Sequence, residues 1–446
     1  MKNKLTKQPL SERLVKPFEK FAEIEASSGI LLFFCTIAAL LWANSPWAES
    51  YTNLWQTKFT IGFGDFALSK PLLLWINDGL MAVFFFAVGL EIKREILIGE
   101  LASFKKAILP IVAALGGMVV PAGIYLLFNH NTQGASGWGI PMATDIAFAL
   151  GVLALLGRRV PVSLKIFLMA LAIIDDIGAV LVIAIFYTSH ISWVNLMIGA
   201  GFLLLLFTAN RTGVRHPLIY AVLGIGGLWL AFLLSGVHAT VAGVLSAFMI
   251  PARTRIHSKE FIQKGKNLID EFETYSQNAK EVLTNQDQQS ILHDLERSCE
   301  LTQTPLQRLE HSLHPWVMYV IMPIFALANA GVSLQAGLSE VLFHPITLGI
   351  VFGLFLGKPI GIFFFSWIAI KLKWAMLPRE VSFKQLAGVG VLGGIGFTMS
   401  LFIASLAFGG SFFLPISKVG ILLASTLAGI AGWTFLKASS CSKEES

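Results

Sequence analysis

Two adjacent carboxylates stand inside an otherwise apolar stretch of the chain. Residues 172–180 read AIIDDIGAV, which places Asp175 and Asp176 among alanine, isoleucine, glycine and valine. Burying an ionisable side chain is costly, so an acid within a membrane span is a candidate functional residue by default. Desolvation and mutual repulsion favour the protonated form of such a pair, and carboxylate oxygens also bind hard cations. The pair therefore predicts a site that binds protons or a cation.

Three further ionisable residues lie in apolar stretches: Asp78, Asp145 and Lys358. A structural ion pair between Lys358 and one aspartate would account for one acid at most, although a structural role remains an alternative for Asp78 alone. Consecutive residues on a helix lie about 100° apart, so Asp175 and Asp176 cannot point in the same direction. We expect one acid to face the lysine and the other to face an ion cavity.

The composition indicates an integral membrane protein. Of the 446 residues, 55% are hydrophobic and 13% are charged, whereas soluble domains carry about 25% charged residues. The basic first twenty residues precede an apolar run at 29–43 that has no cleavage pattern, so we expect an uncleaved helix and not a signal peptide. The net charge is +6, and the positive residues lie mostly in short loops between apolar runs. Such loops orient membrane helices, so we attribute the excess of basic residues to membrane topology and not to nucleic-acid binding. The three cysteines are far apart and predict neither a disulfide framework nor a metal site, and we expect no cofactor.

The apolar stretches predict an all-α membrane protein with twelve transmembrane helices, because a span needs roughly 20 residues of helix. These spans are expected at residues 24–43, 71–90, 107–128, 138–156, 163–187, 192–209, 217–234, 238–250, 315–330, 345–370, 385–408 and 416–436. The stretch 218–250 is read as two short helices that turn near Ser235-Gly236. Basic residues gather in alternate loops and in both tails, which predicts cytoplasmic termini for one polytopic domain, 1–446.

Two segments lie outside the spans. Residues 253–313 are polar, with apolar residues at helical spacing, and predict an extended cytoplasmic loop between spans 8 and 9. We expect one or two amphipathic helices there, lying against the inner face of the protein. Residues 59–69 alternate apolar and small side chains around Gly62-Phe63-Gly64-Asp65, which predicts a small external β-hairpin.

Backbone-breaking residues gather in spans 4 and 11. Pro141 and Thr144 precede Asp145, and residues 388–400 read GVGVLGGIGFTMS. Such patterns indicate unwound backbone that lines a cavity or is buried by protein, although close helix packing through small residues is an alternative for span 11. Spans 3–5 and 10–12 have opposite predicted orientations, so we predict an inverted-repeat transporter fold with two discontinuous helices. Asp145 and Lys358 would compensate the partial charges at the half-helix ends.

Motifs along nearly the whole chain resemble the NhaA family of bacterial sodium/proton antiporters. The matching segments are INDGLMAVFFFAVGLEIKRE (76–95), PMATDIAFALGVLALLG (141–157), LAIIDDIGAV (171–180), SGVHAT (235–240), RLEHSLHPW (308–316), FALANAGVS (325–333), LGKPIG (356–361) and GGIGFTMSLFI (393–403). The resemblance implies a transporter and not an enzyme. It further implies a pH-regulated, electrogenic exchange in which sodium or lithium leaves as protons enter, and a homodimer in the bacterial inner membrane.

The resemblance also implies roles for individual residues. Asp176 matches the principal sodium ligand of the family, and Asp175 matches its neighbour, which exchanges protons and pairs with the lysine at Lys358. Thr144 and Asp145 match the unwound segment of span 4, so sodium is expected at Asp175, Asp176 and Thr144, while Asp78 matches the acid of span 2. The positions associated with pH sensing and regulation are Glu91, Arg94, Glu95, His238, Arg308, Glu310, His311 and His314. Helix-end capping remains an alternative for the three histidines, and the loop 253–313, longer than the usual connector of the family, adjoins Arg308.

Other classes of protein share single features with this sequence. Residues 62–65 form the GxGD motif of intramembrane aspartyl proteases, but Asp65 is expected in an external hairpin and not at membrane depth. A cation channel or a membrane sensor would use the same buried acids. A rigid pore does not need inverted broken helices, and a sensor needs an output domain that residues 253–313 hardly provide.

Overall fold

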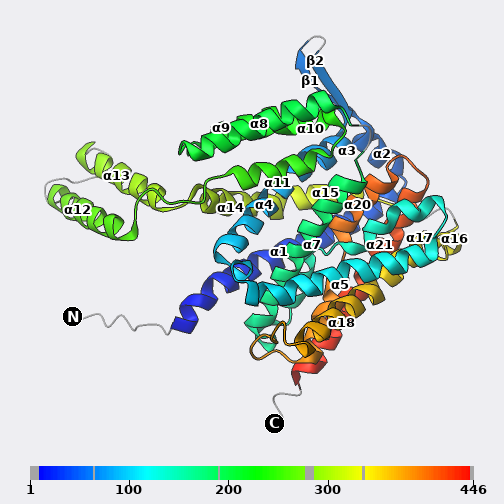
Figure 1. The fold of residues 1–446 in the computed structure, drawn as a ribbon. Helices are drawn as coiled ribbons and strands as arrows, with labels where there is room; N and C mark the ends of the chain where they lie inside the picture. Colours follow the sequence, from blue (N-terminus) through cyan, green and yellow to red (C-terminus); the bar gives the residue numbers. More distant parts are fainter. Residues whose placement is uncertain (1–9, 64–65, 189–190, 277–285, 334–336, 442–446) are drawn as a thin grey trace.

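The computed structural model describes residues 10–63, 66–188, 191–276, 286–333 and 337–441, and it is almost entirely helical (Figure 1). In chain order its elements are α1 (Leu10–Ala43), α2 (Ala48–Gln56), β1 (Lys58–Phe63), β2 (Phe66–Pro71), α3 (Leu72–Trp75), η1 (Ile76–Leu80), α4 (Met81–Ile98), η2 (Glu100–Ala102), α5 (Phe104–Asn129), η3 (Gln133–Met142), α6 (Ile146–Ala154), η4 (Gly157–Arg159), α7 (Val162–Phe186), α8 (Trp193–Arg211), α9 (Pro217–Ala221), η5 (Val222–Trp229), α10 (Leu230–Ser235), α11 (Ala239–Met249), α12 (Ser258–Ser276), α13 (Gln286–Thr302), α14 (Pro305–Trp316), η7 (Val317–Ile321), α15 (Met322–Asn329), α16 (Leu338–Leu342), α17 (Pro345–Phe352), η8 (Gly353–Gly357), α18 (Lys358–Lys371), α19 (Phe383–Gly393), α20 (Phe397–Phe408) and α21 (Phe413–Cys441).

Eight helices in the described part of the chain are long and apolar enough to cross a membrane, or up to eleven if each strongly bent pair forms one span. The chain is therefore a multi-pass membrane protein. Every predicted span overlaps helix, with breaks at residues 143–145 in the fourth and 394–396 in the eleventh. The eighth, α11, is a shorter apolar helix. The count of twelve crossings and their orientations stay predictions.

Local signals set several helix boundaries. Gly236 ends α10 with a φ of 85°, a left-handed conformation that suits glycine, so the predicted turn near Ser235-Gly236 is confirmed. The helix of the ninth predicted span begins at Pro305, well before the expected position 315. Thr304 and Gln307 form a capping box there, and the Thr304 hydroxyl accepts from the backbone amide of Gln307 at 3.1 Å.

The predicted hairpin is confirmed on its described residues. Strands β1 and β2 pair antiparallel, with Lys58 opposite Pro71 and Phe63 opposite Phe66, and they project from one end of the molecule (Figure 1). Residues 64–65, and with them Asp65 of the GxGD motif, lie outside the described residues.

Two interrupted helices contact each other in the middle of the molecule. The pair η3 and α6 bends by 42° around residues 143–145, and the pair α19 and α20 bends by 42° around 394–396. The amide of Asp145 donates to the carbonyl of Ile395 at 2.7 Å. A Cβ at Gly394 would lie 2.4 Å from the Leu354 carbonyl oxygen, so close packing accompanies the break there. Whether each pair forms one crossing, and whether the fold is an inverted repeat, stay predictions.

Helices α5 and α18 are in close contact and hold the element that carries Lys358. A Cβ at Gly116 would lie 2.3 Å from the carbonyl oxygen of Gly361, so backbone meets backbone at this point. Small residues permit such an approach between membrane helices. Helix α7 also packs on α5, which brings its two acids towards the first turn of α18.

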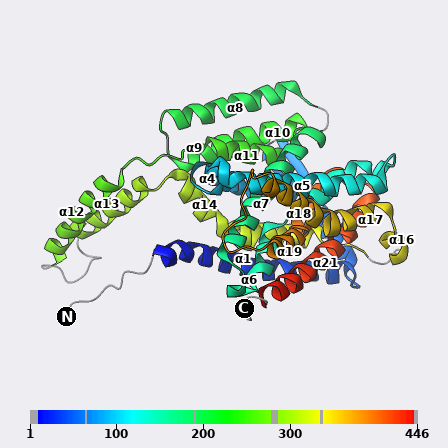
Figure 2. The same cartoon turned by 60° about the horizontal axis from the view of Figure 1, so that its bottom comes forward.

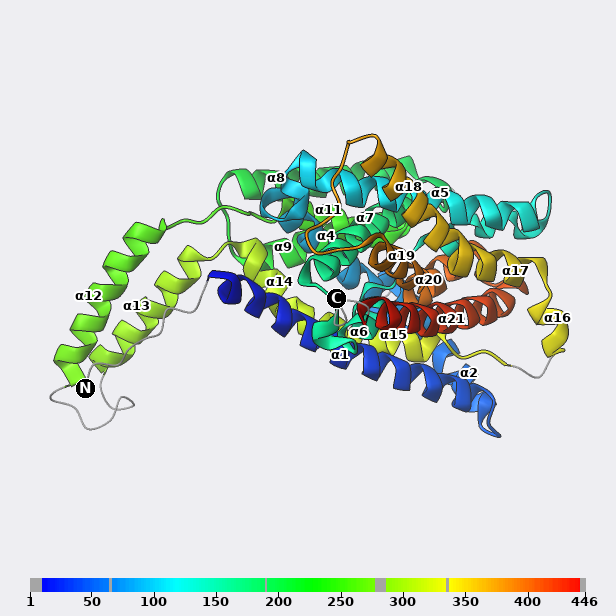
Figure 3. The same ribbon diagram turned by 90° about the horizontal axis from the view of Figure 1, so that it is seen from below.

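Residues 253–313 contain amphipathic helices, as predicted: α12, α13 and most of α14. Helix α14 packs on α4, but α12 and α13 do not lie against the body of the protein. Helices α12 and α13 pack on each other and project away from the remaining helices (Figures 2 and 3). Leu268 and Ile291 are buried, so each helix directs apolar side chains into the pair and not towards the inner face. At the base of the pair, the amides of Arg255 and Ile256, in the linker before α12, donate to the Leu301 carbonyl of α13.

Candidate functional site

The two adjacent acids lie near the middle of α7, and each is 1% exposed. Asp175 forms an ion pair with Lys358, the first residue of α18, and neither side chain has exposed surface. The lysine thus neutralises Asp175. Because the two acids are separated around the helix, one of them was expected to face the lysine.

Thr144 joins this ion pair to both interrupted helices. Its hydroxyl oxygen lies 2.6 Å from Asp175 Oδ2, 2.6 Å from Lys358 Nζ and 2.9 Å from the carbonyl oxygen of Gly393. Lysine donates to the hydroxyl, and the hydroxyl donates to the carboxylate or to the carbonyl. Thr144 lies in the gap between η3 and α6, and Gly393 is the last residue of α19. Interruption of both helices therefore supplies oxygen atoms next to Asp175.

Asp176 is the acid that faces a cavity. Among the described residues, neither of its carboxylate oxygens has a hydrogen-bond partner, and neither has Asp175 Oδ1. Asp176, Thr144 and Asp145 line a cavity of about 40 Å³, which is enough for a small cation or a few waters. A buried carboxylate without a partner is costly. The arrangement can lower that cost by binding a proton or a cation.

Asp145 links the ends of the two interrupted helices. Its Oδ1 accepts from the Phe148 amide of α6 at 3.0 Å, and its Oδ2 accepts from the Thr398 amide of α20 at 3.0 Å and from the Thr398 hydroxyl. An acid at a helix start satisfies free amides and the positive end of the dipole. The compensating role expected of Asp145 stays a prediction. Thr398 was not predicted as a site residue, and its only signal is a hydroxyl side chain directly after the GGIGF segment.

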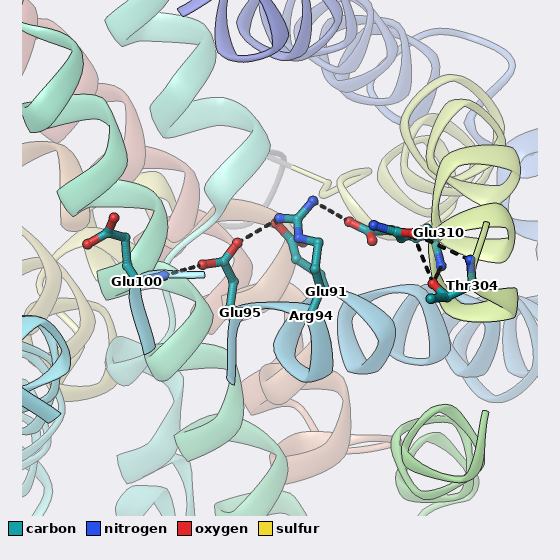
Figure 4. A network of polar contacts seen from close by, with 7 residues as sticks. Glu91, Arg94, Glu95, Glu100, Thr304 and Glu310 are labelled. Carbon is teal, nitrogen blue, oxygen red and sulfur yellow. Dashed lines mark hydrogen bonds and ion pairs between the residues drawn. The ribbon is translucent and has the colours of Figure 1, made fainter. Parts of the chain in front are cut away.

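Several of the residues expected to regulate the protein reach the same cavity. Glu91 of α4 lines it together with Glu310 and His314 of α14. Arg94 connects the two helices, with a guanidinium nitrogen 2.6 Å from Glu310, one 2.8 Å from Glu95 and one 3.9 Å from Glu91. Figure 4 shows this network, in which the Glu95 carboxylate also accepts from the backbone amide of Glu100 at 3.0 Å.

The remaining regulatory candidates lie elsewhere. Arg308 is exposed and pairs with Glu300 of α13 at 2.6 Å, and His311 is also exposed. His238 directly precedes α11 but its side chain makes no capping hydrogen bond, so the capping alternative is not supported there.

The structure places Asp78 away from Asp175 and Asp176. It lies in η1, about 20 Å along the helix from Glu91, and forms an ion pair with Lys70 of β2 at 3.0 Å. His238 lies within electrostatic range of Asp78. These residues therefore form a separate group near the β-hairpin.

The donor atoms of the site define the cation that it could hold. No group of three or more histidine, cysteine, aspartate or glutamate side chains in the described ranges is arranged to hold a metal ion. Around Asp176 the candidate ligands are carboxylate, hydroxyl and backbone carbonyl oxygens, which suit hard cations.

Comparison with known proteins gives one consistent result. Residues 19–436 match the profile of the family described as Na+/H+ antiporter 1. The chain is 54% identical to the Na(+)/H(+) antiporter NhaA of Oleidesulfovibrio alaskensis, over 96% of this chain and 95% of that protein. It is 52% identical to the NhaA of Koribacter versatilis over 94% and 91% of the two chains, and 48% identical to NhaA 1 of Clostridium beijerinckii over the full length of both. The last match includes residues 253–313.

Proposed function

Because the chain belongs to the Na+/H+ antiporter 1 family, we propose that it exchanges sodium ions for protons across the bacterial inner membrane. The members of this family are transporters and not enzymes. The observation that carries the proposal is the buried Asp176 carboxylate, whose two oxygens lack hydrogen-bond partners in the described part of the chain and which lines a cavity.

Competition for the same oxygen atoms couples the two ions. A sodium ion requires ionised carboxylates, together with oxygens such as the Thr144 hydroxyl and the freed Gly393 carbonyl. When the cation leaves, two adjacent buried carboxylates repel each other, and a proton relieves both the repulsion and the desolvation cost. A site that holds sodium or protons but not both becomes an antiporter if it faces the two sides of the membrane in turn.

Lys358 determines the charge that Asp175 carries between transport steps. In the ion pair seen here the lysine occupies one oxygen of Asp175, so a cation that binds between the acids competes with the ammonium group. The pair titrates as a coupled unit, and we propose that more protons enter than sodium ions leave. This makes the exchange electrogenic, and lithium, another hard cation, is the expected alternative substrate.

The charge network on α4 and α14 is proposed to make the exchange pH-dependent. Glu91, Glu310 and His314 line the cavity that contains Asp176, so a change in their protonation alters the field at the site and the contact between the two helices.

Replacement of Asp176 by asparagine tests the proposed transport site. The Asp176→Asn protein should show no sodium-dependent proton movement in inverted membrane vesicles, because a neutral amide cannot exchange a proton for a cation. Asp294→Asn, an exposed change on α13, is the matched control and should transport normally at equal expression. Robust exchange by Asp176→Asn would refute the assignment, and cation leak without proton movement in the unmodified protein would indicate a channel.

Replacement of His238 tests the proposed pH regulation. His238→Ala should shift the pH at which exchange begins while the maximal rate is retained, because the imidazole lies within electrostatic range of Asp78 and does not line the cavity at Asp176. The measurement is the rate of exchange with sodium, lithium and potassium across pH 6 to 9. An unchanged pH profile would remove His238 from the sensing group.

We also propose a homodimer. The β1–β2 hairpin is a two-stranded sheet, so each strand has a free edge, and Phe59 and Ile61 are exposed on it. Free edges can pair with a second strand.

A further inference from the structure

A second cavity, of about 590 Å³, lies between α1, α6 and α21 and shares no lining residue with the cavity at Asp176. Helix α6 packs against both α1 and α21, and Figure 3 shows it between them. The walls are formed largely by apolar side chains, among them Phe33, Phe148, Leu155, Phe397 and Ile430. Leu155 and Ile430 are 67% and 61% exposed, so the cavity opens towards the surrounding lipid. We name it the α1–α21 groove.

The few polar side chains that line the groove are already hydrogen-bonded. The hydroxyls of Thr36, Thr426 and Thr434 donate to carbonyl oxygens one turn earlier in their own helices. The Ser425 hydroxyl accepts from the Phe397 amide at 3.1 Å. Water is stable in a cavity only where it finds several polar partners. These walls therefore favour an apolar occupant.

One end of the groove carries positive charge. Trp433 lines the groove, and the amino group of Lys437 lies 4.6 Å from the centroid of its ring. Arg159 is the last residue of η4, which follows α6 and packs against α21. Both basic side chains are exposed. The predicted topology places this end at the cytoplasmic leaflet, where basic residues attract anionic headgroups.

We propose that the α1–α21 groove binds one acyl chain of an anionic phospholipid, whose headgroup contacts Arg159 and Lys437. The apolar walls select a hydrocarbon chain, and the two cations at one end select an anionic headgroup. A helix from a second copy of the protein is too bulky, because a cylinder about 10 Å across fills this volume within about five residues. An acyl chain is far thinner, and the bilayer supplies it directly.

The bound chain would lie directly behind the contact between the two interrupted helices. The rings of Phe148 and Phe397 face the groove in an edge-to-face pair with centroids 5.6 Å apart. The Phe148 amide donates to Asp145, and Thr398, which also binds Asp145, follows Phe397. Occupancy of the groove therefore stabilises the packing around Asp145, whichever ions the protein transports.

The test uses the purified full-length protein and one substitution that fills the groove. Gly429 lines the groove, and a Cβ at this position would meet only Ile395, at 3.8 Å, so Gly429→Phe directs a ring into free space. Leu427→Phe adds a ring to the same helix at a position that is 39% exposed and outside the lining. The probes are phosphatidylglycerol and phosphatidylcholine, added after removal of native lipid. Bound lipid is counted by native mass spectrometry, and thermal unfolding is followed in parallel.

The unmodified protein and Leu427→Phe should retain one phosphatidylglycerol and unfold at higher temperature when it is added, whereas Gly429→Phe should show neither effect. The double variant Arg159→Gln/Lys437→Gln should lose the preference for phosphatidylglycerol by on the order of tenfold or more, and it keeps the proposal testable if Gly429→Phe does not fold. Equal lipid retention by Gly429→Phe and its control would overturn the proposal. So would an unchanged headgroup preference in the double variant, or a loss of dimer in Gly429→Phe with its lipid still bound.

Discussion

Lys358 and Asp175 form an ion pair with no exposed side-chain surface. Removal of one partner leaves the charge of the other buried and uncompensated, which costs about 3–5 kcal/mol. Removal of both partners leaves neither charge of the pair. We therefore expect Lys358→Ala to lower the unfolding temperature in detergent strongly, and Lys358→Ala/Asp175→Ala to lower it less. Lys384→Ala, an exposed change on α19, should have no effect. A double variant as unstable as the single variant would show that the lysine acts through packing and not through charge.

The charged site residues could be predicted from the sequence because charges are rare in apolar spans. Asp175, Asp176, Asp145 and Lys358 were found in this way, and the structure brings them together. Thr398 was missed because a hydroxyl side chain in an apolar helix usually bonds its own backbone. The Gly393 carbonyl was missed because every residue has one, and only the path of the chain shows which carbonyl is free. Asp78 has the same signal as the other acids but pairs with Lys70 instead.

At the scale of elements, one carboxylate caps two helices that lie far apart in the sequence. Asp145→Asn should slow sodium/proton exchange without abolishing it, because the amide keeps one acceptor oxygen but loses the negative charge. Loss of a helix cap costs about 0.5–2 kcal/mol, so a lower unfolding temperature is also expected. The measurements are the initial exchange rate in vesicles and thermal unfolding of the purified protein.

Thr398→Ala is the companion variant for Asp145. It removes one hydroxyl contact and keeps the charge, so its effect should be smaller. Residues in contact show non-additive effects, and Asp145→Asn/Thr398→Ala should be less harmful than the two single effects added together. Strict additivity would mean that the two side chains act independently.

Helix positions were predictable because apolar runs have the length of a span, but helix ends were less so. The start of α14 was missed because hydropathy does not register an amphipathic turn, although Thr304 and Gln307 carry a readable capping signal. Helical spacing of apolar residues predicted α12 and α13 without showing which surface those residues would cover. They cover each other, and no local pattern distinguishes that outcome from packing on the body.

At the scale of the whole molecule, most buried apolar residues in the described part of the chain belong to two clusters. The larger contains residues of α1, α5, α7 and α17 to α21, and the smaller is centred on α8 to α11, with Leu90 of α4 and Leu306 of α14. Helix α4 contributes to both clusters and carries Glu91 and Arg94. The charge network therefore lies where the two clusters meet, a position from which protonation can affect how they pack.

The proposed homodimer is tested by the exposed hairpin. Replacement of residues 58–71 by a short glycine-serine linker should convert the dimer to a monomer in detergent, because it removes the free strand edges. Phe59→Lys/Ile61→Lys, which keeps the backbone but adds charge to the exposed face, should weaken the dimer less than the deletion. Size-exclusion chromatography with light scattering gives the mass, and an unchanged mass for the deletion variant would place the interface elsewhere.

The projecting pair α12 and α13 has a practical consequence for visualising this protein. A chain of 48.6 kDa that is largely surrounded by lipid or detergent offers few features for aligning particle images. The helix pair extends beyond the membrane-embedded body, and backbone hydrogen bonds at its base join the linker before α12 to α13. An antibody fragment raised against the exposed faces of this pair would add a rigid marker far from the ion site. Such a marker would allow electron cryomicroscopy of the exchanger in sodium and in acid, with its transport residues unmodified.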